Sequence, residues 1–341
     1  MLFYTEEKFN THYNCNALTD EEWESEGHPN LILGIIYILI SIPFFVASFP
    51  CILVMKKKEF RKNTVYKFLI LEGINDIIGI IISSYITGYF TIRGTNFCTH
   101  RVFNYVLGNV TFFIWTCTGM TAILLVLNRI IDLSNPVLAA SLFDGNKTLI
   151  WLMIPILYGA FYFFFTPPIV FSSSIYAFAY DPYLGTSMDA EMNANYSYTT
   201  IFQPFNNFFI SGSLILLYTI LCTLLFKKSN AGGKSKGLSK LQKNLVIQSI
   251  LICFPILFTA IMYVMFQYIQ LTAGIIIFAQ IAWISAHSVP SLIYIVFNSS
   301  IRNCIVSEYL PAYFQKKITN PTVITVIPAS KNTKSMHHDL I

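Results

Sequence analysis

Charged residues are scarce in this sequence. Asp, Glu, Lys and Arg make up 11% of its 341 residues, and apolar residues make up 55%. A soluble domain carries about 25% charged residues. Intrinsic disorder needs low hydrophobicity and high net charge, so it is excluded for most of the chain. A soluble enzyme is disfavoured for the same reason, and the composition is typical of a membrane protein.

Common catalytic and phosphate-binding motifs are also missing. Gly233-Lys234-Ser235 resembles the end of a phosphate-binding loop, but Lys228 stands where that loop needs glycine. The sequence holds no H-E-x-x-H motif. His337 and His338 are adjacent metal-type ligands without further partners. We therefore expect no enzymatic activity, no cofactor, no metal site and no nucleic-acid partner.

Seven long apolar segments dominate what is present. A helix needs about 20 mostly apolar residues to cross a bilayer core of about 30 Å. The sequence therefore predicts an all-α integral membrane protein, a bundle over residues 31–297 that follows an N-terminal segment, 1–30. The predicted spans are Leu31–Met55, Tyr66–Phe90, Val102–Leu127, Thr148–Phe171, Gln203–Phe226, Leu245–Tyr268 and Thr272–Phe297.

Residues 298–341 follow the last predicted span. Ile301, Cys304, Ile305 and Tyr309 recur at helical spacing with polar residues between them. This pattern predicts a short amphipathic helix along the inner membrane face. Beyond Pro311 the composition becomes polar, which predicts a flexible cytosolic tail.

Lysine and arginine gather on one side of the predicted spans. They crowd the loops at 56–62 and 227–243 and recur after the last span. Of the 22 lysines and arginines, only Lys8, Arg93 and Arg101 fall on the other side. Because the cytosolic side carries the excess of basic residues, this pattern places the N-terminus outside and the C-terminus in the cytosol.

Two of the seven cysteines, Cys15 and Cys98, fall on the outer, oxidising side. Cys15 precedes the first span by 16 residues, an extended reach of about 50 Å. We predict a Cys15–Cys98 disulfide, and two free thiols remain the alternative. Of the N-x-S/T sequons, Asn195 alone lies in a predicted outer loop, so it is the expected glycosylation site.

The second predicted span carries two acidic residues. Asp76 lies about 15 Å from its inner end, near the bilayer midplane. A lipid-facing carboxylate there costs about 2.5–3.5 kcal/mol or more, so Asp76 should face the bundle interior. Glu72, one turn earlier, shares that face. Ser285 and His287 of the last span are candidate partners. This polar node either binds an ion or couples helices, or it simply fixes helix packing.

Two prolines and one arginine are candidates for a conformational change, the prolines as hinges and the arginine as a switch. Pro255 and Pro290 lie inside the sixth and seventh spans, where each removes a backbone hydrogen bond and can act as a hinge. Arg129 ends the third span. It either reaches the lipid phosphates or acts as a switch toward neighbouring helices or a partner protein.

A set of short motifs resembles one known family, the nematode serpentine receptor class T chemoreceptors, which are similar to rhodopsin-like G-protein-coupled receptors. The likeness is distinctive from about Tyr13 to Phe226 and more diffuse to about Asn303. The motifs are Tyr13-Asn14-Cys15 with Trp23, Pro50-Cys51, Tyr66-Lys67, Gly73-Ile74-Asn75-Asp76, Gly88-Tyr89, Phe97-Cys98, Leu127-Asn128-Arg129, Leu142-Phe143-Asp144-Gly145, Pro155-Ile156-Leu157-Tyr158-Gly159 and Asn206-Asn207.

The resemblance implies a seven-helix receptor that detects small environmental molecules and activates a heterotrimeric G protein. It implies the plasma membrane as location, with the sensory cilia of neurons as a candidate site. It also implies that Asn128-Arg129-Ile130 stands where such receptors carry Asp/Glu-Arg-Tyr, with Pro136 in the expected place after it. The acidic residue before Arg129 is absent here.

We expect a small, uncharged or weakly polar ligand to enter from outside, beneath the loop Ser172–Phe202. Ligand binding would shift a two-state equilibrium that opens the inner ends of the helices. The predicted ligand contacts are Thr111, Phe112, Trp115, Ile256, Ala260 and Trp283.

Other functions remain open at this stage. A ligand-gated channel would need a polar stripe along a pore. A transporter would need discontinuous helices and repeated halves. A receptor-like scaffold or trafficking protein would bind no ligand. A receptor oligomer is a further open point, and the lipid bilayer is a partner in every case.

Overall fold

The computed structural model describes residues 6–230, 240–269 and 272–309. The predicted tail beyond Tyr309 and the lysine-containing loop 231–239 lie outside these residues, as do His337 and His338.

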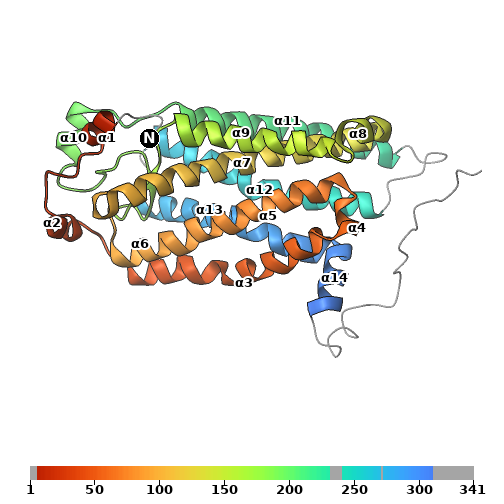
Figure 1. Cartoon of the computed structure of the whole chain (residues 1–341), viewed down its shortest axis with the longest axis horizontal. Coiled ribbons are helices and arrows are strands. Elements are labelled where there is room, and N and C mark those ends of the chain that lie inside the picture. The colour runs from red at the N-terminus through yellow and green to blue at the C-terminus, as the bar shows by residue number, and fades with distance from the viewer. Residues whose placement is uncertain (1–5, 231–239, 270–271, 310–341) are drawn as a thin grey trace, which may run out of the picture.

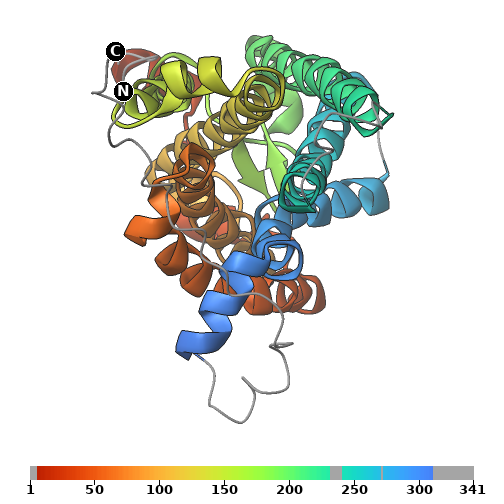
Figure 2. The same ribbon diagram turned by 90° about the vertical axis from the view of Figure 1, so that its right-hand side faces the viewer.

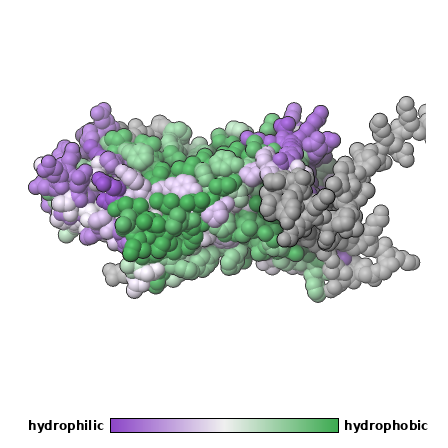
Figure 3. Space-filling view, turned by 90° about the horizontal axis from the view of Figure 1, so that it is seen from below, coloured by the Kyte–Doolittle hydropathy of each residue, from purple (hydrophilic) through white to green (hydrophobic). Residues whose placement is uncertain are grey.

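Seven helical rods run side by side along the long axis of the molecule (Figure 1). They form a membrane-protein bundle whose apolar belt is flanked by hydrophilic ends (Figure 3). Five of the helices are individually long and apolar enough to cross a membrane. The rods are α3 (Leu31–Met55), α5 (Thr64–Ile80) continued by the π-helix η1 (Ile81–Ile86) and α6 (Thr87–Arg93), α7 (Arg101–Ser134), α9 (Lys147–Phe165), α11 (Phe202–Asn230), α12 (Lys240–Tyr268) and α13 (Ala273–Phe297).

Short elements cover both ends of the bundle. The end predicted to be extracellular carries α1 (Glu6–His12), α2 (Asp20–Ser25), η2 (Cys98–His100), β1 (Val170–Ser172), β2 (Ala177–Ala179) and α10 (Asp189–Asn195). The opposite end carries α4 (Lys58–Arg61), α8 (Pro136–Phe143) and α14 (Ser299–Tyr309). Local sequence explains two of these starts. Thr19 and Glu22 form a capping box at α2, and Asn135 caps α8 with Pro136 in its first turn.

The fourth rod is shorter than the sequence predicted. The predicted span reached Phe171, but α9 ends at Phe165. Thr166 is extended because it precedes Pro167, and a residue before proline is disfavoured in the helical region. The chain then enters an antiparallel hairpin in which Phe171 pairs with Phe178.

The second rod contains an unpredicted π-helical turn, η1. Its wider spacing shows in the Thr87 hydroxyl, which donates to the Ile82 carbonyl five residues earlier (2.7 Å). The Ser84 hydroxyl lies 2.6 Å from that of Ser41 and donates to the Tyr37 carbonyl (2.5 Å). These bonds fix the π-helical turn against α3.

Helix α7 occupies the centre of the bundle. It packs against α5, α8, α9, α11 and α12, and the view along the bundle shows the hairpin strands at the middle of the ring of helices (Figure 2). The main core cluster joins side chains of α7, α11, α12 and α13 with Phe171 and Phe178 of the hairpin. The hairpin is therefore part of the core.

The predicted short helix after the last span is present as α14. The Asn298 side chain accepts the Ile301 amide (3.1 Å) and caps the helix. Ile301 and Val306 are buried, and Lys57 of the first loop pairs with Glu308. Helix α14 is thus docked against the bundle.

Candidate functional site

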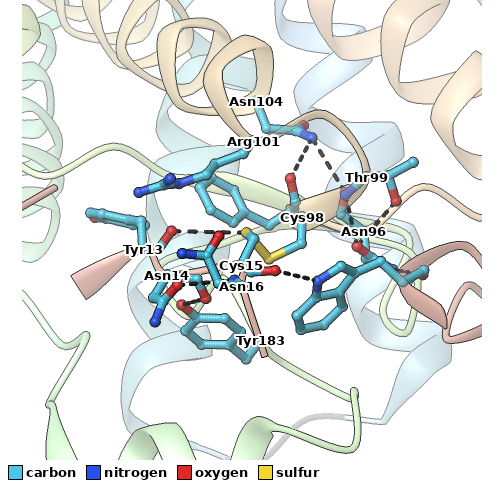
Figure 4. Close-up of a disulfide and its surroundings, with 12 residues drawn as sticks. Tyr13, Asn14, Cys15, Asn16, Asn96, Cys98, Thr99, Arg101, Asn104 and Tyr183 are labelled. Atoms are coloured by element: carbon cyan, nitrogen blue, oxygen red, sulfur yellow. Dashed lines mark hydrogen bonds between the residues drawn. A yellow bond between two sulfur atoms is a disulfide. The ribbon is translucent and has the colours of Figure 1, made fainter. Parts of the chain in front are cut away.

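A disulfide ties the N-terminal segment to the start of the third rod. As predicted, Cys15 and Cys98 are joined, with their Cα atoms 5.5 Å apart (Figure 4). The Trp23 indole donates to the Cys15 carbonyl (2.8 Å), and the Tyr183 hydroxyl donates to the Asn14 carbonyl (2.8 Å). Burial raises the pKa of Tyr183 to about 12, so this hydroxyl stays a donor at neutral pH.

The residues before α3 and the hairpin loop form one folded layer, which we call the cap (residues 6–30 and 166–201). Arg101 lies 4.1 Å over the Phe9 ring and donates to the Phe9 carbonyl (3.0 Å). The Tyr198 hydroxyl donates to the His12 carbonyl (2.6 Å). The buried cluster beneath these bonds comprises Phe9, Tyr13, Trp23, Phe97, Cys98, Tyr105, Val170 and Tyr183.

A small, mostly apolar cavity lies under the hairpin, among α7, α11, α12 and α13. Its volume is about 20 Å³, which holds about one water molecule. A larger ligand therefore requires wall side chains to move. The walls are Thr111, Phe112, Trp115, Ile169, Gln203, Thr259, Tyr263 and Trp283.

Four of the six predicted ligand contacts line this cavity. Thr111 and Trp115 are four residues apart on α7, so they share one helix face. The Thr111 hydroxyl donates to the Leu107 carbonyl (2.8 Å), and the Trp115 indole donates to Asn207 Oδ1 (2.9 Å). Phe112 and Trp283 complete the set.

The other two predicted ligand contacts, Ile256 and Ala260, are buried core residues and are not among the cavity walls. The Ala260 carbonyl accepts the Asn207 amide (3.3 Å), so this position lies where α12 meets α11. The neighbouring face of α12 supplies Thr259 and Tyr263 instead.

Thr259 is the functional candidate that the sequence reading missed. Its side chain is fully buried, and its hydroxyl has no hydrogen-bond partner within the described part of the chain. An unpaired buried hydroxyl is costly, so a ligand with a complementary polar atom would recover that cost. A hydroxyl residue inside an otherwise apolar segment was the available signal.

The predicted polar node is partly assembled. His287 Nδ1 lies 3.2 Å from Asp76 Oδ1, and both side chains are buried. Glu72 is also buried, and neither carboxyl oxygen has a hydrogen-bond partner among the described residues. Ser285 does not join them, because its hydroxyl donates to the Ile281 carbonyl (2.8 Å). It lies two residues before His287, about 200° around the helix.

His287 links the node to the cavity. Its ring lies 6.5 Å from that of Trp115 and 6.4 Å from that of Trp283, both with steep interplanar angles. A shift of either tryptophan therefore acts directly on the partner of Asp76. Pro255 and Pro290 lie inside α12 and α13; their hinge role stays a prediction.

Arg129 is buried at the opposite end of α7, with 6% of its surface exposed. Asp132, Tyr66 and Tyr218 act on it electrostatically. Asp132 stands three residues later on the same helix face, a spacing that permits an ion pair, and the sequence reading missed it. Asp132 is therefore the acidic residue that acts on Arg129 from its own helix.

A cleft of about 400 Å³ opens beside Arg129, between the first two loops of that end. Asn128, Asp132 and Pro136 line it together with residues of α4, α5 and α8. Two of the three predicted switch residues, Asn128 and Pro136, thus share one mixed polar and apolar surface.

Asn195 is exposed at the C-terminal end of α10, within the cap. Its glycosylation stays a prediction. In the described ranges, no group of three or more His, Cys, Asp or Glu side chains is arranged to hold a metal ion.

Comparisons with known proteins point to seven-transmembrane receptors. The model of a family described as "Serpentine type 7TM GPCR chemoreceptor Srt" matches residues 1–318. Serpentine receptor class T-55 of Caenorhabditis elegans is 25% identical over 325 residues, which cover 95% of this chain and 86% of that receptor. The crystal structure of squid rhodopsin is similar in fold, with a TM-score of 0.56 and 13% identity over 87% of this chain and 88% of that one.

Proposed function

The chain belongs to the Srt family of serpentine seven-transmembrane chemoreceptors, and we propose that it is a plasma-membrane receptor that binds a small molecule and activates a heterotrimeric G protein. The cap is the extracellular face in this proposal, and the end with α8 and α14 is the cytosolic face. The observation that carries the proposal is the cavity under the hairpin, whose tryptophans contact the buried Asp76–His287 pair.

The cavity walls favour an uncharged ligand. No charged side chain is among the wall residues, so an ionic ligand would lose its hydration without a partner. Thr259 offers one hydroxyl that has no partner among the described residues, which suits a ligand with a single alcohol, ether or carbonyl group. Because the cavity has a volume of only about 20 Å³, ligand binding would select a conformation with displaced wall side chains.

Transmission to the other end would follow from that displacement. A ligand that moves Trp115 or Trp283 also moves His287, which contacts both rings and pairs with Asp76. The rods α5 and α13, which carry this pair, would shift relative to each other. At the far end Arg129 would leave its buried place beside Asp132 and contact the G protein. The shift is limited by the ligand's differential affinity for the two conformations.

The direct test is a signalling assay in cultured cells that express a promiscuous G protein, screened with volatile and soluble small molecules. We expect a response from the wild type and none from Arg129→Ala at equal surface expression. Arg302→Ala is the matched control, because Arg302 binds the carbonyls of Ile295 and Val296 away from the cleft walls. A response that Arg129→Ala retains would contradict the proposed switch.

The same assay separates the other readings. A response that Arg129→Ala retains and that is carried as ionic current would indicate a ligand-gated channel. Silence of well-expressed protein across the panel, with partner proteins still recovered, would favour the scaffold reading.

A further inference from the structure

A groove opens on the lipid-facing side of the bundle, between the second rod and the start of the third. Its volume is about 480 Å³ and its walls are almost entirely apolar, a size typical of small-molecule sites. Tyr89 and Phe103 are 53% and 51% exposed, so its outer walls face lipid. The walls are Tyr85, Ile86, Tyr89, Phe90, His100 and Phe103.

A continuous chain of aromatic rings joins this groove to the cavity. Phe90 lines the groove, yet it is buried and its ring lies 5.4 Å from that of Phe171 in the hairpin. Phe171 lies 5.8 Å from Phe178, and Phe178 lies 5.6 Å from Trp283, a cavity wall. Phe90 therefore lies between the groove and the hairpin ring of Phe171 that leads to the cavity.

The backbone beside this side chain is irregular. Tyr85 and Ile86, two groove walls, belong to the π-helical turn η1. π-turns are uncommon, and they occur frequently at functional sites. Ser84 holds the backbone of this turn against α3 through hydrogen bonds. Opening of the groove would therefore require the side chains of Tyr89 and Phe90 to move, and not the backbone of the turn.

The aqueous route is more costly. A ligand arriving through the cap would have to separate its buried aromatic cluster, at about 1.5–3 kcal/mol for each large side chain exposed to water. It would also break the hydrogen bonds that Tyr183 and Tyr198 donate to the N-terminal segment, and the Cys15–Cys98 disulfide limits how far that segment can move. Phe90 can rotate into lipid without exposure to water.

We propose that the groove is a lateral entrance through which an uncharged, lipophilic small molecule passes from the bilayer into the cavity, with Phe90 as the gate. This inference rests on the proposed function in one respect, that the cavity is the ligand site. The groove walls lack charge, and the exposed His100 is the polar group at the rim. The molecule that fits must therefore partition into a membrane first.

The test uses full-length receptor in phosphatidylcholine vesicles and a neutral ten-carbon alkyl diazirine that partitions into the bilayer. Brief illumination at successive times, followed by peptide mass spectrometry, maps the labelled residues. In the wild type we expect labels on Tyr89 and Phe103 first and on Trp115 and Trp283 later. Phe90→Trp should slow cavity labelling by about fivefold or more, because the larger ring overpacks the gate. Phe90→Ala should accelerate it.

Phe208→Trp is the matched control, because Phe208 is an exposed phenylalanine of α11 away from the groove. It should leave cavity labelling unchanged. Retention of the Cys15–Cys98 disulfide in each variant verifies folding. Cavity labelling that is equal in Phe90→Trp and Phe90→Ala would overturn the route. So would groove labelling without cavity labelling in Phe90→Ala, which would mark the groove as an ordinary lipid site.

A charged, water-soluble diazirine provides the second arm. We expect it to leave Trp115 and Trp283 unlabelled, and labelling of both from the water side would also overturn the route. None of these readouts needs signalling. If the probe passes Phe90 but cavity substitutions never alter agonist responses, the proposed function fails and the route stands.

Discussion

At the scale of single residues, Thr259 carries a buried hydroxyl for which the described residues offer no hydrogen-bond partner. We expect Thr259→Val to leave thermal stability unchanged or raise it, by up to about 1 kcal/mol, because valine has a similar shape and buries no unpaired group. The same substitution should weaken agonist potency about fivefold to tenfold if the ligand bonds to this hydroxyl. Concentration–response curves measure the second effect.

Thr118→Val is the matched control for that prediction. Thr118 is equally buried and its hydroxyl is likewise unpaired, but it does not line the cavity. It should reproduce the stability change without the potency change. Equal loss of potency in both variants would mean that Thr259 acts through packing and not through a ligand bond.

The sequence alone predicted where the charged residues of the spans lie. A carboxylate or guanidinium in hydrocarbon is costly, so Asp76 and Arg129 had to face the interior or the membrane edge. Ser285 and His287 were both candidate partners of Asp76, and the structure places His287 beside it. Asp132 was not predicted, because the acidic residue of the family motif directly precedes the arginine, whereas Asp132 stands three residues after Arg129.

At the scale of helices, the sequence could not predict which face of each span points into the bundle. A span faces lipid on one side and protein on the other, and both surroundings accept apolar side chains, so periodicity does not mark the inner face. On α12, periodicity did not show that Thr259 and Tyr263 line the cavity, whereas the predicted contacts Ile256 and Ala260 lie in the core. The end of α9 was readable from Pro167 and Pro168, but the apolar run that follows obscured it.

The contact between α5 and α13 depends on a glycine. A Cβ atom added to Gly79 would lie 2.4 Å from Cγ of His287, closer than any nonbonded contact allows. We expect Gly79→Ala to displace His287 from Asp76 and to lower stability by about 1–3 kcal/mol, the usual cost of overpacking. Thermal unfolding of purified receptor in nanodiscs measures it.

Gly212→Ala on α11 is the control for Gly79→Ala. Nothing lies within 4 Å of a Cβ atom added there, so alanine should stabilise the helix by about 0.5–1 kcal/mol. If both glycine variants shift the melting temperature in the same direction, the close α5–α13 contact is not what Gly79 provides.

The cap is a second element whose contribution can be measured. Cys15 and Cys98 are 83 residues apart in sequence, and loss of a disulfide that closes a long loop typically costs about 2–5 kcal/mol. We expect Cys98→Ser to lower the melting temperature and to reduce surface expression. Cys222→Ser, at an exposed free cysteine, should change neither. A disulfide-free variant as stable as the wild type would show that the aromatic cluster alone holds the cap.

At the scale of the whole molecule, we expect the charge distribution to set the orientation in the membrane. The end that carries α4 holds Lys56, Lys57, Lys58, Arg61 and Lys62, whereas the cap end holds three basic residues among the 22. We expect a tag at the N-terminus to be stained on intact cells and a tag at the C-terminus only after permeabilisation. The reverse pattern would place the cavity on the cytosolic side and contradict the receptor proposal.

The bundle joins two features at opposite ends. The cavity contacts the Asp76–His287 pair through two tryptophans, and α7 runs from the cavity to Arg129 and the cleft beside it. A receptor needs such a connection, because a ligand at one end must change the surface at the other. Sequence resemblance pointed to both ends, and the contacts between them came from the structure.

Nucleotide exchange on a purified heterotrimeric G protein tests the central claim most directly. Wild-type receptor in lipid nanodiscs would be compared with Arg129→Ala and Thr259→Val, each with and without an agonist found in the cell screen. The account predicts exchange that agonist accelerates in the wild type, that needs a higher agonist concentration in Thr259→Val and that is lost in Arg129→Ala. Exchange that agonist leaves unchanged in well-folded wild-type receptor would contradict it.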